Sequence, residues 1–126
     1  MAQEMTLSLK DVKAMFDALK YRNTVESIAG FMPKKPTAIH VVGGGCQDKL
    51  LCALTSDACG LPVYAGPIEA TAIGNISMQA IAAGELKNVS EARELIARSI
   101  ELDTYEPTMA DKNAWDEAYE KFVKLL

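Results

Sequence analysis

Three consecutive glycines, Gly43-Gly44-Gly45, are the residues of this sequence best suited to hold a ligand. They follow an apolar run, Thr37 to Val42, that is typical of a buried parallel strand, and they precede a stretch that favours helix. Glycines at such a turn permit positive φ and leave no Cβ between the backbone and a ligand. The amides and the positive dipole end of the following helix favour a phosphate or adenosine group. We therefore expect nucleotide contacts at this turn; the alternative is a tight turn that needs glycine only for its geometry.

Neither of two common nucleotide-binding motifs is present. The turn lacks the Gly-Lys-Ser/Thr end of a Walker loop, and no third glycine follows Gly45 at the spacing of a Rossmann fingerprint. Other polar candidates are weaker. His40 is the only histidine and lies within the apolar run, so we expect a sheet or core side chain. Glu69 begins a predicted helix, where its carboxylate is stabilised by the dipole.

Asn75 and Gln79 lie four residues apart and are expected to make a buried amide contact. None of these residues forms a nucleophile–base pair, so we predict no catalytic residue in this sequence.

Cys52 and Cys59 are separated by about 10 Å along one predicted helix, too far for a disulfide. With no Cys-x-x-Cys pair and one histidine, the sequence indicates buried or half-buried thiols and no metal site.

Composition places the chain among ordinary globular domains. Its 126 residues are 49% hydrophobic and 24% charged, and 13 Lys+Arg against 17 Asp+Glu give a net charge of −4. This balance argues against a nucleic-acid or anionic-membrane partner. No apolar run approaches the roughly 18 residues that span a bilayer. The first residues, Met1 to Glu4, do not resemble a signal peptide, so we expect a cytoplasmic protein.

The elements around the glycines predict an α/β fold with two short parallel strands and about five helices. We expect helices at residues 8–31, 46–59, 68–83, 88–100 and 111–125, and strands at residues 37–42 and 61–65. Residues 102–108 are expected to be irregular. Because a stable sheet usually needs about three strands or more, the chain is expected to be a piece of a larger domain or to self-associate.

The first predicted helix carries two apolar stripes that differ by about half a turn. One stripe holds Leu9, Val12, Met15 and Phe16, and the other holds Tyr21, Val25 and Ile28. We therefore predict that the helix is interrupted between about Phe16 and Arg22, or that its first half packs on a second chain. The alternative is an unbroken helix buried on two sides.

The run from Ile39 to Asp48 resembles the adenosine-site strand and loop of the FGGY carbohydrate kinases. Further runs, Asp57 to Gly60, Gly66 to Asn75 and Tyr105 to Pro107, resemble the members of this family that act on L-rhamnulose. The likeness covers most of residues 14–122. It implies a partial actin-like, ribonuclease H-like lobe, in which residues 1–126 are a C-terminal fragment of the second lobe of a kinase.

The resemblance also implies a function. FGGY kinases transfer the γ-phosphate of ATP, with Mg²⁺, to a sugar, which here would convert L-rhamnulose to L-rhamnulose 1-phosphate. Gly44, with Gly43 and Gly45, would contact the nucleotide. The phosphate loops, most sugar contacts and the catalytic base would lie upstream, so the chain alone is predicted to be inactive.

Two departures from the family pattern stand out. Asp48 replaces an expected Asn, and two residues are missing near Phe16. Two alternative functions remain open: a free-standing nucleotide-binding module without kinase activity, and a purely structural interaction domain.

Overall fold

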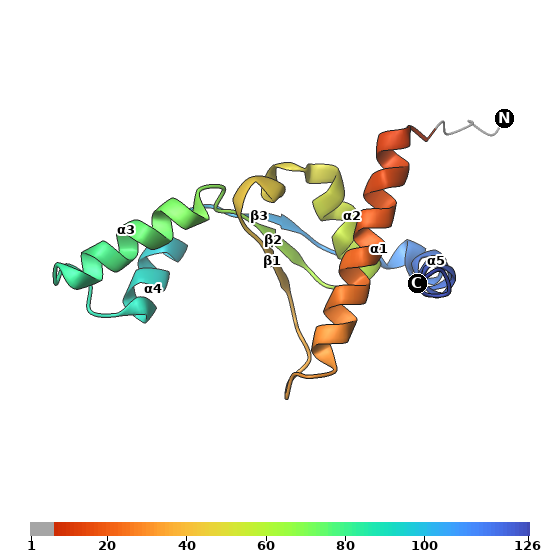
Figure 1. Ribbon diagram of the computed structural model, residues 1–126. Helices are drawn as coiled ribbons and strands as arrows, with labels where there is room; N and C mark the ends of the chain where they lie inside the picture. The colour runs from red at the N-terminus through yellow and green to blue at the C-terminus, as the bar shows by residue number, and fades with distance from the viewer. Residues whose placement is uncertain (1–6) are drawn as a thin grey trace.

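The chain forms helices and short strands in a computed structural model that describes residues 7–126 (Figure 1). The helices are α1 (Leu9–Ala29), α2 (Lys49–Cys59), α3 (Ala70–Ala82), α4 (Val89–Ser99) and α5 (Lys112–Val123). The strands are β1 (Ile39–Val41), β2 (Val63–Ala65) and β3 (Asp103–Tyr105), and short 3-10 turns lie at Gly43–Gln47 and Met109–Asp111. Within the described range, no helix has both the length and the apolar character needed to cross a membrane. Residues 1–4, on which the expectation about a signal peptide rests, lie outside that range.

The sheet has three strands in the order β1-β2-β3, which corrects the expectation of two. β1 and β2 are parallel, with Ile39 opposite Val63, as expected. β3 is antiparallel to β2 and places Tyr105 opposite Val63, so residues 102–108 are not all irregular. This strand reads Asp-Thr-Tyr and has no apolar run of its own. Residues 103–105 are a strand because they pair with β2, and a local sequence pattern does not reveal such a long-range contact.

A small core lies between α2 and one face of the sheet. Cys46 and Cys52 pack there against Val63 and Ala65, and half-buried side chains from β1 and β3 complete the cluster. The opposite face carries His40, which is exposed and whose ring centroid lies 5.2 Å from that of Tyr64. The expectation that His40 is a sheet side chain is therefore confirmed.

The hydroxyl of Ser56 joins α2 to two other segments. This side chain is fully buried, with an exposed fraction of 0%. Its oxygen lies 2.7 Å from the carbonyl oxygen of Leu61 and 3.0 Å from that of Tyr105, so its one proton is shared between the two acceptors. Ser56 thereby fixes α2 against the loop before β2 and the last residue of β3.

Helix α1 is continuous from Leu9 to Ala29, so the predicted interruption near Phe16 is wrong. It begins with a capping box, in which Ser8 and Asp11 each accept a hydrogen bond from the other's backbone amide. Ion pairs one turn apart, Lys13 with Asp17 at 2.7 Å among them, span the region where a break was predicted. These local contacts support regular helix whichever way the apolar side chains point.

The alternative expectation, an unbroken helix buried on two sides, is also wrong within the described chain. The buried residues of α1 are Ala14, Ala18 and Leu19, and α2 is its most extensive neighbour. Phe16 packs edge-to-face on the buried Phe122 of α5 with 6.4 Å between ring centroids, yet it remains 46% exposed. Tyr21, in the second stripe, is 47% exposed. Both stripes therefore have uncovered apolar surface.

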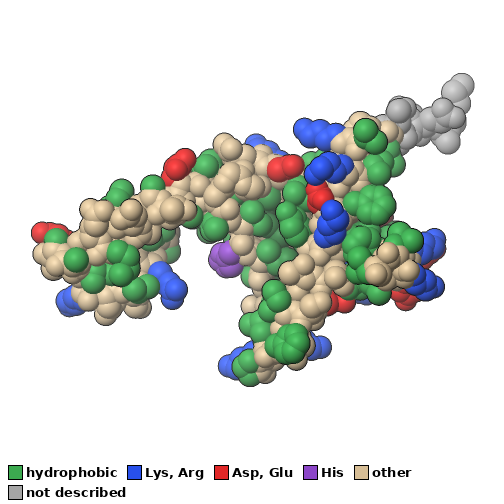
Figure 2. Space-filling view, viewed as in Figure 1, with side chains coloured by type: hydrophobic (Ala, Val, Ile, Leu, Met, Phe, Trp, Pro, Cys, Tyr) green, Lys and Arg blue, Asp and Glu red, His purple; other side chains and the backbone are tan. Residues whose placement is uncertain are grey.

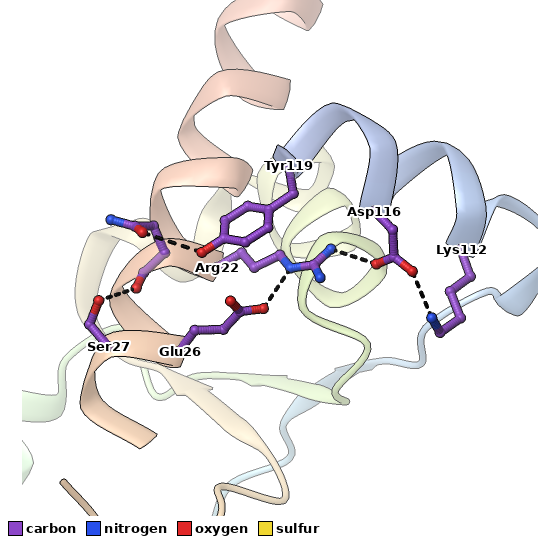
Figure 3. Close-up of polar contacts among 7 residues, drawn as sticks. Arg22, Glu26, Ser27, Lys112, Asp116 and Tyr119 are labelled. Atoms are coloured by element: carbon purple, nitrogen blue, oxygen red, sulfur yellow. Dashed lines mark hydrogen bonds and ion pairs between the residues drawn. The ribbon is translucent and has the colours of Figure 1, made fainter. Parts of the chain in front are cut away.

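Helix α5 docks on α1 through Arg22, which is 17% exposed (Figure 3). Its guanidinium donates to Asp116 at 2.9 Å and to Glu26 at 2.9 Å, and it lies 4.3 Å from the centroid of the Tyr119 ring. Hydrogen bonds from Lys112 and Arg22 lower the pKa of the Asp116 carboxyl. The carboxylate is therefore charged at neutral pH and holds the two helices together.

The only tryptophan of the sequence, Trp115, lies at the same junction. It is half-buried and shares a hollow with Met15 and Leu19 of α1 and Leu54 of α2. Phe122, on the same helix, is buried as well, so these two aromatic residues of α5 serve in packing.

Helices α3 and α4 form a hairpin that projects from the sheet (Figure 1). The chain turns between them at Gly84, whose φ is +81°, and the side chain of Asn88 caps α4 by accepting from the amide of Glu91 at 2.9 Å. Helix α3 reads ATAIGNISMQAIA, contains no charged residue and has no buried residue. A helix of this composition is typical of a buried element.

We predict that Ser56→Ala lowers the free energy of unfolding by about 1–3 kcal/mol, because two part-buried carbonyl oxygens lose their shared donor. Ser99→Ala is the matched control, since Ser99 also donates to a backbone carbonyl but is exposed. Urea titration followed by circular dichroism measures both. Equal effects of the two substitutions would contradict the role assigned to Ser56.

Candidate functional site

The glycine turn lies at the carboxyl end of β1, where β1 and β2 end side by side. Gly43 has a φ of +77°, and its amide donates to the carbonyl oxygen of Pro67 at 3.0 Å. The amide of Gly66 donates in return to the carbonyl oxygen of Val41 at 2.8 Å. These two bonds tie the glycine turn to the Gly66-Pro67 turn that follows β2. The edge where ligands bind in α/β sheets is therefore built from both turns.

The structural reason for a glycine differs among these three positions. Gly43 needs its positive φ, which side chains rarely adopt. Gly45 would place a Cβ in ordinary contact with Val41, at 3.7 Å. Gly44 is exposed, its φ lies outside the left-handed range, and an added Cβ would meet nothing within 4 Å. Nothing within the described chain therefore explains glycine at Gly44, and the turn offers bare backbone to a ligand at this position.

The segment after the glycines differs from the expected helix at residues 46–59. Gly43–Gln47 form a 3-10 turn, and α2 begins only at Lys49. Asp48 lies between them as the N-cap and accepts a hydrogen bond from the amide of Leu51 at 3.1 Å. Asn and Asp cap helices equally well, so this role accounts for the aspartate that departs from the family pattern.

The Asp48 cap changes what the start of α2 can bind. We expected the helix to point free amides at a phosphate or adenosine group, but one first-turn amide is already bonded to a carboxylate. The negative charge of Asp48 also offsets the positive dipole end of the helix. The start of α2 is therefore a poor phosphate site and suits an uncharged part of a ligand.

A cavity of about 560 Å³ lies beside the two turns. Cys46, Gln47, Gly66 and Pro67 form part of its wall. Its charged lining residues are Lys49, Glu69, Glu101 and Asp103, so three carboxylates oppose one ammonium group. Such a cavity repels phosphate groups, whereas it has the size and hydrogen-bonding groups to hold a nucleoside.

Sequence reasoning identified the turn but missed part of this cavity. Asp103 belongs to residues 102–108, which we expected to be irregular, and Glu101 directly precedes them. Their local sequence contains no signal for a site. Glu69 is the N-cap residue of α3, but its side chain makes no capping hydrogen bond and instead lines the cavity. His40 is not part of this cavity.

The remaining candidates are structural. Gln79 donates to Asn75 at 3.0 Å, but this pair is exposed, so the expected buried contact is wrong.

Cys46 and Cys52 are buried and Cys59 is half-buried, and all three are free thiols as predicted. Burial raises the pKa of Cys59 to about 11, so this thiol is protonated at neutral pH and is a weak nucleophile. Among residues 7–126, no group of three candidate ligands gathers that could hold a metal ion.

Comparison with known proteins identifies the family. Residues 14–83, more than half of the chain, match the FGGY family of carbohydrate kinases, C-terminal domain. The chain therefore belongs to the FGGY family of carbohydrate kinases. A curated relative, rhamnulokinase of Bacteroides thetaiotaomicron, is 46% identical over 113 residues. That match covers 88% of this chain but only 23% of the relative.

A solved structure has the same fold. Xylulose kinase from Rhodospirillum rubrum superposes with a TM-score of 0.67 at 20% sequence identity, over 89% of this chain and 22% of that one. The arrangement of α1 to α5 around the small mixed sheet is thus that of part of a sugar kinase.

The different demands on the glycines give a prediction for stability. Gly43→Ala is expected to lower the free energy of unfolding by about 1–2 kcal/mol, because alanine is strained at positive φ. Gly44→Ala should change it by less than about 0.5 kcal/mol, since its Cβ meets open space. Thermal or urea unfolding of the two variants measures the difference. A large loss of stability in Gly44→Ala would show that this glycine serves the fold.

Proposed function

We propose that this chain is a C-terminal portion of the nucleotide-binding lobe of a sugar kinase, with residues 1–126 as part of a longer actin-like, two-lobed enzyme. The observation that carries the proposal is Gly44, which is bare backbone at the carboxyl edge of the sheet for no reason within the described chain. In this proposal Gly43, Gly44 and Gly45 contact the adenosine end of ATP.

The charges around the turn support this orientation of ATP. Asp48 caps α2, and three carboxylates line the neighbouring cavity. Both features disfavour the triphosphate, so the adenosine end faces this chain and the phosphates point toward the rest of the enzyme. Family membership implies Mg²⁺ as well, but the described residues gather no ligand set for it. We therefore assign no magnesium ligand and no catalytic base to this chain.

For the sugar, we propose L-rhamnulose, phosphorylated to L-rhamnulose 1-phosphate in the cytoplasm as part of rhamnose metabolism. The 46% identity to a rhamnulokinase supports this substrate. Because phosphoryl transfer depends on groups positioned from both lobes, the chain alone is expected to be inactive.

Nucleotide titration tests the proposed function. The chain should bind a fluorescent ATP analogue, and Gly44→Ala should weaken binding about tenfold or more, because its Cβ occupies the space next to the backbone. Gly74→Ala is the control, since this helical glycine of α3 also has nothing within 4 Å of an added Cβ. A coupled assay with ATP, Mg²⁺ and L-rhamnulose should detect no turnover.

Three results would contradict the proposal. Absence of nucleotide binding would favour a structural interaction domain. Equal binding by wild type and Gly44→Ala would place the nucleotide elsewhere. Robust sugar-dependent ADP release by the chain alone would show that it is a complete enzyme.

We also expect the isolated chain to self-associate, because large apolar side chains are exposed on several of its elements. Leu9 is 88% exposed, Phe31 92% and Ile76 66%. Light scattering over a concentration series should show dimers or larger species. A single monomeric species at high concentration would contradict this prediction.

A further inference from the structure

Asp103 places a carboxylate on the core face of the sheet, at the cavity beside the glycine turn. It is the first residue of β3 and lies directly opposite Ala65, the last residue of β2. Residues directly opposite each other in a ladder point their side chains to the same face. Ala65 is buried in the core cluster with Cys46. Tyr105, two residues after Asp103, packs against the same cluster, so the side chain of Asp103 points to the face that α2 covers.

This carboxylate is free to bind a donor from outside the chain. Asp103 is exposed, and it takes part in none of the ion pairs among residues 7–126. Lys49, the cation that lines the same cavity, takes part in none of them either. An ionised carboxylate only accepts hydrogen bonds, so a ligand that fits here must offer donors.

A charge on the core face of an edge strand also has a purely structural explanation. Such a charge discourages a further strand from pairing with the edge. Within residues 7–126, β3 pairs only with β2, so this explanation applies to Asp103. It requires the charge alone, whereas recognition of a ligand requires that the carboxylate match particular donor groups.

The cavity offers different surroundings to the base and to the ribose of a nucleotide. Ile68, Ile73 and Ile100 line it and provide apolar contacts for a flat base. A ribose carries two neighbouring hydroxyl groups, and the two oxygens of one carboxylate can accept a hydrogen bond from both. Acidic side chains recognise ribose hydroxyls in this way in dinucleotide-binding folds. The chemistry at Asp103 therefore suits the ribose.

The other two acidic residues of the cavity are held less firmly than Asp103. Glu69 lies at the start of α3, and Glu101 lies in the connection between α4 and β3. Figure 2 shows acidic side-chain atoms at the surface where α3 leaves the sheet. Asp103 is fixed by the ladder with β2, and its shorter side chain has fewer rotatable bonds. Groups on regular elements are positioned more precisely than groups on loops, so Asp103 is the best placed of the three to recognise a defined geometry.

We propose that Asp103 selects ribonucleotides at this site, with its carboxylate accepting hydrogen bonds from the 2′ and 3′ hydroxyls of ATP. This inference rests on the proposed function, in which the adenosine end of ATP faces this chain. The ribose is uncharged, so it gains from a carboxylate that repels the phosphates. Asp103 thereby both selects the sugar of the nucleotide and favours the orientation in which the phosphates leave the cavity.

Calorimetric titration with unlabelled nucleotides tests the proposal, because a fluorophore on the ribose would block the hydroxyls. The chain should bind ATP about tenfold or more tightly than 2′,3′-dideoxy-ATP, which lacks both donors. Asp103→Ala should weaken the binding of ATP about tenfold and leave that of dideoxy-ATP unchanged. This variant should therefore no longer distinguish the two nucleotides.

Glu106→Ala is the matched control. Glu106 directly follows β3, is exposed and lies outside the cavity, so its substitution removes the same charge without touching the site. It should keep the full preference for ATP. Asp103→Asn, which keeps one acceptor oxygen but loses the charge, should retain a reduced preference of about threefold.

Melting temperatures separate recognition from the structural explanation. Asp103→Ala should not lower the melting temperature of the chain, because the carboxylate has no ion-pair partner among residues 7–126. A lower melting temperature with an unchanged preference for ATP would assign Asp103 to the fold and overturn the proposal.

A change of base identifies which part of the nucleotide the carboxylate contacts. Inosine triphosphate keeps the ribose and lacks the exocyclic amine of adenine, so Asp103→Ala should weaken its binding as much as that of ATP. If only ATP responds, the carboxylate contacts the base and the proposal is wrong. Equal affinity of the unsubstituted chain for ATP and dideoxy-ATP would overturn this inference alone. Absence of binding by every nucleotide would overturn the proposed function, and this inference with it.

Discussion

The arrangement of the sheet depends on the buried hydroxyl of Ser56, because this one proton satisfies carbonyl oxygens from two segments that are far apart in the sequence. It holds α2 at a fixed distance from the start of β2 and the end of β3. At its N-terminal end, α2 is capped by Asp48, which directly follows the glycine turn. The position of the turn relative to β2 and the Gly66-Pro67 bend is therefore set from both ends of one short helix. A small core buries little apolar surface, so a shared hydrogen bond positions elements that apolar packing would position in a larger domain.

Features whose causes are local were predictable from the sequence. The helices and the glycine turn depend on residues within a few positions of each other. β3 was missed because its only signal is its pairing with β2. The phase change in α1 was noticed correctly but explained wrongly. Hydrogen bonding keeps that helix regular, and within residues 7–126 both apolar stripes keep exposed side chains.

For the candidate site, too, only features with local causes were predictable from the sequence. Three glycines between a strand and a helix predict a nucleotide contact at this turn, and this stays a prediction. The sequence does not separate the structural reasons for the three glycines, which needed the φ of Gly43 and the open space at Gly44. The carboxylates of Glu101 and Asp103 reach the cavity through the fold. In the proposed function their charge, together with that of Asp48, disfavours the phosphate end of ATP at this site. Charge balance over the whole sequence contains no such information.

The position of Trp115 has an optical consequence. It is the only indole in the sequence, and it lies where α5 meets α1 and α2. Its emission therefore reports the polarity of that junction alone, without interference from the glycine turn or the projecting hairpin. Global unfolding exposes the indole too, so a red shift that precedes the loss of far-UV circular dichroism would signal that α5 separates from α1 before the rest of the chain unfolds. The chain thus contains a natural spectroscopic probe at the contact of its last helix.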